Sequence, residues 1–201
     1  MPFEFDTTQE YILENDRVLL RPLKLEDYEN LLPFALNEPE LWKYSLITAA
    51  GEDGLANYLD IALEARTARK EYPFIVFDKQ RNGYAGSTRF YDINPAFKSL
   101  QLGYTWYGKN FQRTGLNRHC KFLLLSFAFE DLGMERVEFR ADNDNERSVA
   151  AMKAIGCKVE GVLRSHMPTR NPEVRRDSII LSILKDEWFG GAKENLEEKL
   201  K

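Results

Sequence analysis

The fold is decided by the stretch LQLGYTWYGKNFQRTGLNRHCKFLLLSFAFEDL, which occupies residues 100–132. Its first eight residues (100–107) alternate in polarity and are rich in aromatic side chains, which predicts a β-strand. A turn at residues 112–117 contains Gly115, and an apolar helix is expected from His119 onward. Such a junction directs free backbone N–H groups and the positive end of the helix dipole to one point. The turn therefore predicts an anion site, whose usual ligand is a diphosphate.

The spacing of the turn excludes two common phosphate-binding motifs. A P-loop needs Gly-x4-Gly-Lys-Ser/Thr, which the chain does not contain. A Rossmann fingerprint needs three glycines, whereas the turn holds Gly115 alone. The turn also follows an expected antiparallel hairpin rather than a first parallel strand. The ligand must therefore be held by a different strand–turn–helix arrangement.

A second set of signals follows in the sequence. Residues 136–140 predict a short strand, and Asn143-Asp144-Asn145-Glu146-Arg147-Ser148 leads into a helix at residues 149–155. Gly156 ends this helix, and residues 157–164 begin another strand. Asn143 and Glu146 have the spacing of a capping box, which would leave Asn145 free to face a ligand. The alternative is that Asn145 itself caps the helix.

With these motifs the chain resembles the GNAT (Gcn5-related N-acetyltransferase) superfamily, in the branch of the RimJ/RimL ribosomal-protein acetyltransferases. The acetyl-CoA motif of that family, Gln/Arg-x-x-Gly-x-Gly/Ala, is similar to residues 112–117, although Asn117 stands where Gly or Ala is common. The order Asn-x-x-Ser, helix, Gly, Val-x-Glu-Gly is also shared. The resemblance covers residues 17–188 and implies acetyl transfer from acetyl-CoA to an amine.

Composition indicates one globular domain over residues 1–201, with peripheral tails at 1–9 and 190–201. A chain of 201 residues buries roughly 70% of its unfolded surface. No apolar run approaches the ~20 residues of a membrane span, and the N-terminus lacks a signal-peptide pattern. The net charge of −4 argues against nucleic-acid binding. Cys120 and Cys157 lie in apolar contexts, so we expect buried free thiols and a cytoplasmic protein.

We predict an α+β fold with a mixed, mostly antiparallel twisted sheet flanked by helices. The expected strands and helices follow from period-2 and period-3.6 patterns. The charged tail from Gly190 is expected to be frayed or weakly helical. Besides the elements above, we expect a strand at 17–23, helices at 26–36 and from Leu55, a hairpin of 73–77 and 84–92 turning at 81–83, and a final hairpin of 158–166 and 178–184 joined by a loop at 168–176.

The resemblance implies which residues hold acetyl-CoA. Backbone N–H groups of the turn would hold the diphosphate, with added charge from Arg113. The strand before the turn splays from its neighbour in this family and binds pantetheine through its main chain, so Tyr104 and Trp106 side chains also fit core packing. The implied cofactor-binding residues are Thr105, Trp106, Tyr107, Arg113, Thr114, Gly115, Leu116, Asn117, Asn145 and Ser148.

The sequence identifies the catalytic residues less completely than the cofactor-binding residues. Ser148 lies where RimL-type enzymes place a serine beside the CoA sulfur, or it is an ordinary first-turn serine. Many relatives use a tyrosine one turn later as general acid, and that position is Met152 here. The glutamate base of histone-acetylating relatives aligns with Gln101, which cannot act as a base. The remaining candidates for the base are Tyr104, Asp92, Glu138, Glu160, His166 and water relays.

The acceptor amine follows from this missing base. An α-amine with a pKa near 8 is about one-fifth neutral at pH 7.4, whereas a lysine amine is neutral only about one part in a thousand. The site therefore suits an α-amine, such as a protein or peptide N-terminus. We expect the acceptor to contact the segment 42–44 and the helix from Leu55. Family relatives are often dimers, which makes a homodimer an additional expectation.

Two other functions remain open from the sequence. The chain could be a non-catalytic module that binds CoA or acyl-CoA, because Met152 replaces the usual acid and no base is evident. It could also be an interaction domain without a nucleotide ligand. We expect no metal site, since His119, His166 and the cysteines lack ligand spacing. The arginines at 164, 170, 175 and 176 are expected to form a solvated surface.

Overall fold

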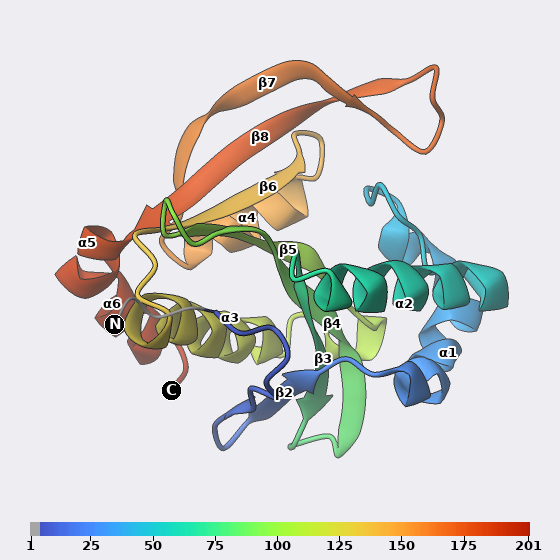
Figure 1. The fold of residues 1–201 in the computed structure, drawn as a ribbon, viewed down its shortest axis with the longest axis horizontal. Helices are drawn as coiled ribbons and strands as arrows, with labels where there is room; N and C mark the ends of the chain where they lie inside the picture. The colour runs from blue at the N-terminus through green and yellow to red at the C-terminus, as the bar shows by residue number, and fades with distance from the viewer. Residues whose placement is uncertain (1–4) are drawn as a thin grey trace.

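A computed structural model describes residues 5–201, whose strands form one continuous mixed sheet in the order β1-β2-β3-β4-β5-β6-β8-β7 (Figure 1). Neighbouring strands are antiparallel except β5 and β6, which are parallel. The predicted α+β class is therefore confirmed. The strands are β1 (Leu13–Glu14), β2 (Val18–Pro22), β3 (Tyr72–Asp78), β4 (Gly83–Asn94), β5 (Ser99–Tyr107), β6 (Arg136–Asp142), β7 (Lys158–Pro168) and β8 (Arg175–Leu184).

Helices cover the two faces of the sheet separately. Helices α1 and α2 pack on one face, while α3 and α4 lie on the other (Figure 1). The helical elements are η1 (Leu25–Asp27), α1 (Tyr28–Asn37), η2 (Pro39–Trp42), α2 (Gly51–Thr67), η3 (Lys109–Phe111), α3 (Leu116–Ser126), η4 (Phe127–Asp131), α4 (Glu146–Ala154), α5 (Lys185–Glu187), η5 (Trp188–Ala192) and α6 (Lys193–Glu198).

The core consists of two hydrophobic layers, one on each face. Trp106 packs with Trp42 and Tyr58 beneath α1 and α2, with ring centroids 5.0 Å and 6.4 Å away. The next residue, Tyr107, belongs to the layer under α3 together with Phe90. Successive side chains of a strand point to opposite faces, so the end of β5 is anchored in both layers. The two layers hold this strand end firmly beside the turn that follows it.

Most predicted elements are present with shifted ends. The hairpin of β3 and β4 turns at the expected place, where Asn82 has a φ of 51°. Helix α3 begins at Leu116, earlier than the expected start at His119, because Gly115 caps it with a φ of 86°. Strand β8 begins at Arg175, so the loop of the last hairpin is shorter than predicted. Strand β1 was not predicted, since its two residues carry no periodicity.

Both ends of the described chain pack against the core. Leu196 on α6 is buried beside α3, and Trp188 is fully buried. Of the two alternatives for the tail after Gly190, the helical one is confirmed by α6 and the frayed one is wrong, because Leu196 supplies an apolar anchor. Of the predicted N-terminal tail, residues 1–4 lie outside the described part, while Phe5 and Thr7 are buried. No helix within residues 5–201 is long and apolar enough to cross a bilayer.

Candidate functional site

Strands β5 and β6 diverge at the middle of the sheet. They pair only where residues 99–101 face residues 136–138. Beyond Gln101, β5 remains paired to β4 on one side and has no strand on the other. Its outer edge between Leu102 and Tyr107 therefore offers backbone groups to an extended ligand, in the manner of an added strand. This is the splay that the resemblance implied, and it leads from the middle of the sheet to the N-terminus of α3.

A bulge in β5 accompanies the divergence. Gly103 faces Arg89 and Trp106 faces Ser87, so Tyr104 and Thr105 together oppose a single residue of β4. Tyr104 has a φ of 49°, which turns the chain at this point. The position before it must be glycine, because a Cβ on Gly103 would lie 2.9 Å from Cε1 of Tyr91. The bulge re-aims backbone groups at the mouth of the splay.

Tyr104 is better suited to donate a proton than to accept one. Burial raises the pKa of its phenol, and the nearby charge of Glu71 raises the pKa further. Its ring packs against Tyr91 at a centroid distance of 5.0 Å and beneath the guanidinium of Arg89 at 4.3 Å. A phenol that stays protonated at neutral pH cannot act as a base. Among its expected roles, this environment favours a hydrogen-bond donor.

The turn after β5 exposes an array of backbone donors. No acceptor within the described chain is recorded for the N–H groups of Arg113, Thr114, Gly115 and Asn117. Gly115 adopts the left-handed conformation as N-cap of α3, and a Cβ placed there would meet open space. Arg113 is also left-handed, with a φ of 59°. These donors and the positive end of the helix dipole lie where the sequence predicts an anion site.

Side chains fix the turn and add positive charge. Gln112 donates from Nε2 to the carbonyl of Tyr107 at 2.7 Å and accepts from Arg147 at 2.7 Å. It thereby links the end of β5 to the start of α4 across the splay. Arg17 forms an ion pair with Asp78 at 2.9 Å and lies 3.4 Å from Oγ1 of Thr114. The side chain of Arg113 is exposed, and it is available to a phosphate.

Helix α4 begins on the far side of the splay. Its N-cap is Asn145, whose Oδ1 accepts the N–H of Ser148 at 3.2 Å. The capping role considered for Asn143 is therefore wrong: β6 extends to Asp142, whose carbonyl accepts the N–H of Asn145. Capping occupies the carbonyl oxygen of Asn145 and leaves its amide N–H2 for a ligand. The hydroxyl of Ser148 is half-buried, and Met152 is buried one turn later.

Lys121 on α3 was not expected to be functional. Its side chain is 5% exposed, and its Nζ donates to Oγ1 of Thr105 at 3.0 Å. On the other side Nζ lies 5.6 Å from the ring centroid of Phe139 on β6. The ammonium group thus lies between the two diverging strands. Burial lowers its pKa from 10.5 to about 8, and no carboxylate pairs with it in the part of the chain that the structure describes.

Asn117 lies on the same side of α3 as Lys121. The two residues are four apart, so they lie one above the other on the helix surface. Oδ1 of Asn117 is buried without a hydrogen-bond partner among residues 5–201. Buried polar atoms are normally paired, so an acceptor and a cation left in this gap indicate a polar ligand. The sequence signal was a lysine in an otherwise apolar helix, four residues after the asparagine of the turn.

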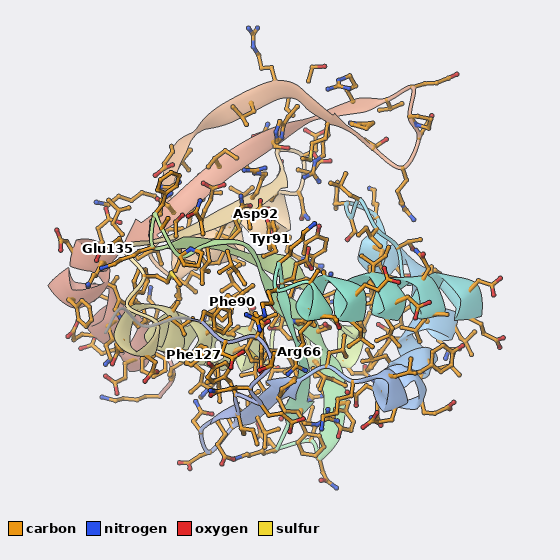
Figure 2. The ribbon with its side chains drawn as sticks, viewed as in Figure 1. Arg66, Phe90, Tyr91, Asp92, Phe127 and Glu135 are labelled. Carbon is orange, nitrogen blue, oxygen red and sulfur yellow. The ribbon has the colours of Figure 1, made fainter. Side chains whose placement is uncertain are left out.

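The carboxylates considered as bases are engaged elsewhere. Asp92 accepts from Gln101 at 2.9 Å, and in Figure 2 it lies with Tyr91 between β6 and α2. Glu138 pairs with Arg136 at 2.8 Å and with Arg140 at 2.9 Å. Glu160 pairs with Arg136 and accepts from Ser182 at 2.6 Å. Each carboxylate is already engaged by these donors, and the hydrogen bond from Arg136 lowers the pKa of Glu160, which disfavours a role as general base.

Two other features of the surface carry no assignment. A hollow of about 790 Å³ lies beside the end of α4 and α6, away from the splay. Lys158 and Glu187 in its wall pair with each other at 2.6 Å. Within residues 5–201, no group of three potential ligands forms a metal site. The two cysteines are buried and free, as expected.

Comparison with known proteins shows which sequences and folds this chain is similar to. A sequence profile described as "Acetyltransferase (GNAT) domain" matches residues 17–158. "Uncharacterized N-acetyltransferase p20" of Bacillus licheniformis is 25% identical over 183 residues, which cover 89% of this chain and 98% of that protein. The crystal structure of a GCN5-related N-acetyltransferase from Brucella melitensis superposes with a TM-score of 0.87 at 25% identity, covering 96% and 86% of the two chains. Ribosomal-protein-S5-alanine acetyltransferase from Vibrio fischeri shares the fold, with a TM-score of 0.71 at 20% identity over 89% and 98%.

Proposed function

Because the chain belongs to the GNAT acetyltransferase family, we propose that it transfers an acetyl group from acetyl-CoA to a primary amine within a ternary complex. The observation that supports this proposal is that the free N–H groups around Gly115 follow directly after the edge of β5 that β6 leaves unpaired. A diphosphate fits the donors of the turn. The rest of the cofactor arm fits the unpaired edge of β5.

The cofactor arm would be held mainly by backbone groups. Thr105, Trp106 and Tyr107 would contribute their main chain, since the side chains of Trp106 and Tyr107 are buried in the core. Arg113, Thr114, Gly115, Leu116 and Asn117 would surround the diphosphate. Buried Oδ1 of Asn117 and the free amide of Asn145 would pair with the amide groups of pantetheine. This arrangement would extend the thioester toward Tyr104 and Ser148.

The chemistry proposed is direct attack. The neutral amine attacks the thioester carbonyl, the C–N bond forms, and the C–S bond breaks as the thiolate leaves. Backbone N–H groups of the bulge at Tyr104 would stabilise the oxyanion. The hydroxyl of Ser148 would donate a hydrogen bond to the sulfur. The ammonium of Lys121 would donate a proton to the thiolate, which yields the free CoA thiol. Lys121 would then be reprotonated by the proton that the amine nitrogen loses on acetylation.

The proposed acceptor is an α-amine, such as a peptide N-terminus. All the carboxylates considered as bases are engaged by neighbouring donors, and burial raises the pKa of Tyr104 so that its phenol stays protonated. A site without a strong base needs an amine that is already partly neutral, and α-amines meet that requirement far better than lysine side chains. Activity confined to lysine side chains of peptides would contradict this part of the proposal.

The test measures the release of CoA thiol from acetyl-CoA in the presence of different amines. The panel contains peptides with free N-termini, lysine peptides with blocked N-termini, polyamines and amino acids. We expect turnover with free α-amines and little with blocked lysine peptides. Binding of acetyl-CoA, measured by calorimetry, without turnover on any amine would instead support a non-catalytic CoA-binding module. This is the alternative function, because Met152 stands in place of the usual tyrosine acid. Failure of the folded protein to bind CoA would refute both functions.

A further inference from the structure

Three buried nitrogen atoms without partners lie on the last three strands of the sheet. They are Nε of Arg140, Nε of Arg176 and Nδ1 of His166, none of which has a hydrogen-bond partner among the described residues. Their strands, β6, β8 and β7, are consecutive neighbours in the sheet. Guanidinium groups are donors only, and an imidazole nitrogen becomes a donor when protonated. The three atoms together therefore indicate a site for an acceptor group with negative charge.

The strand pattern brings the two arginines to one face. Phe139 on β6 and Ile179 on β8 belong to the core layer under α3. Because side chains alternate along a strand, Arg140 and Arg176 lie on the other face. This part of the sheet extends beyond α1 and α2, and the β7–β8 hairpin arches over it (Figure 1).

A bulge in β7 lies beside Arg176 and includes His166. Leu163 faces Ser178 and Met167 faces Arg176, so the three residues between them on β7 oppose Asp177 alone. Ser165 has a φ of 49°, and its N–H donates to Oδ1 of Asp177 at 2.7 Å. Bulges of this kind redirect side chains next to functional sites. Burial lowers the pKa of His166, and the positive charges of Arg140 and Arg176 lower it further.

Arg176 differs from the other buried and half-buried arginines on the strands. Arg21, Arg89, Arg136 and Arg140 each pair with a carboxylate at 2.9 Å or less. The guanidinium of Arg176 is half-buried and contacts only the carbonyl of Tyr44, at 3.3 Å, and the sulfur of Met167, at 3.7 Å. Burial lowers the pKa of Arg176, with Asp142 acting in the opposite direction. A desolvated cation without an ion pair is costly, and a bound anion would offset that cost.

The position of this cluster relates it to the acceptor. The guanidinium of Arg176 contacts the carbonyl of Tyr44, which joins the hairpin to the segment expected to meet the acceptor. The cluster therefore lies on the side from which an amine would approach, whereas the cofactor turn and α3 lie on the opposite side.

We propose that Arg140, Arg176 and His166 form an anion-binding site that recognises a carboxylate of the acceptor, so that the acceptor is an amine that also carries a carboxylate. This inference rests on the proposed acetyl transfer. Arg176 would form the ion pair that it lacks within the chain, and Arg140 and His166 would complete the hydrogen bonds. The carboxylate comes either from the main chain of a small amino acid or from an acidic side chain near a peptide N-terminus.

Kinetics with matched acceptors tests the site. Each amino acid is compared with its amide, and each peptide with aspartate in the second position is compared with its asparagine counterpart. We expect wild-type kcat/KM to favour the carboxylate by at least about tenfold, which is the effect of about 1.4 kcal/mol. Arg176→Gln should remove this preference mainly through KM and leave the uncharged acceptors unchanged. Arg164→Gln, an exposed arginine on the same hairpin, is the control and should keep the preference.

A second readout does not depend on turnover. The chain has two histidines, so the imidazole NMR signal of His166 can be assigned by comparison with His119→Gln. Adding N-acetylglycine should shift the His166 signal and raise its pKa, whereas N-acetylglycinamide should not, and Arg176→Gln should abolish the response. A shift without turnover would support the anion site while the acetyl-transfer proposal fails. Turnover with equal use of acids and amides, or a His166 signal unaffected by the carboxylate, would overturn the anion site whether or not acetyl transfer stands.

Discussion

Replacing Lys121 by methionine should make the protein more stable and less active. Methionine fills a similar volume without a charge. The fall of the lysine pKa from 10.5 to about 8 corresponds to about 3 kcal/mol of unfavourable free energy for the buried ammonium. The lost hydrogen bond to Thr105 offsets only part of this gain in stability. The Thr105 hydroxyl is not left unpaired, because it keeps its 2.7 Å contact with Thr88. We expect Lys121→Met to be more stable by about 1–3 kcal/mol at pH 7.

The pH dependence gives the sign of this effect. Below about pH 8 Lys121 is protonated in both states, and the folded protein bears the full penalty. Between about pH 8 and 10.5 the unfolded chain binds more protons, so wild-type stability rises relative to Lys121→Met. Urea denaturation followed by circular dichroism at several pH values measures the difference. Lys153→Met, at an exposed position on α4, is the control and should change stability by less than about 0.5 kcal/mol.

Catalysis should respond in the opposite direction. If Lys121 protonates the leaving thiolate, kcat of Lys121→Met should fall by about 10²-fold or more at pH 7, with little change in acetyl-CoA affinity. The activity that depends on this acid should decline above about pH 8 in the wild type, and this decline should be missing in the variant. A variant that is less stable than wild type at pH 7 and equally active would refute the reasoning, because Lys121 would then be an ordinary structural residue.

Three further substitutions test the turn, the leaving group and the sheet. Gly115→Ala places a Cβ on a residue with a φ of 86° and into the space assigned to the diphosphate. The Kd of this variant for acetyl-CoA, measured by calorimetry, should rise at least about tenfold. An unchanged Kd would count against the site. Ser148→Ala should lower kcat by about tenfold or less without altering that Kd, whereas a lost affinity would assign Ser148 to binding. Gly86→Ala puts a Cβ 2.0 Å from the carbonyl oxygen of Trp106, so it should destabilise the fold by more than about 4 kcal/mol; a wild-type melting temperature would contradict the β4–β5 pairing.

Local patterns were sufficient to predict most elements of the fold. Alternation identified β5, and Gly115 identified the turn, because glycine adopts the left-handed conformation of that turn without a steric penalty. The choice between Asn143 and Asn145 as N-cap was not local. Both side chains can cap a helix, and the outcome depends on how far β6 continues before the chain turns.

The rest of the candidate site depends on contacts between distant segments. The burial of Lys121 follows from the positions of β5 and β6, which no single segment encodes. The arginines of the last hairpin were expected to be solvated, yet Nε of Arg176 is buried. Its guanidinium contacts the carbonyl of Tyr44 and the sulfur of Met167, and Met167 lies opposite Arg176 because of the register shift between β7 and β8. Sequence periodicity does not reveal such a register shift.

The most direct test of the account is a crystal structure of the protein with CoA bound. We predict the diphosphate within hydrogen-bonding distance of the N–H groups of Gly115 and Asn117, and the pantetheine arm along β5. The sulfur should lie between Ser148 and Nζ of Lys121. CoA bound in the hollow beside α6, or with its arm outside the gap between β5 and β6, would contradict the central claim.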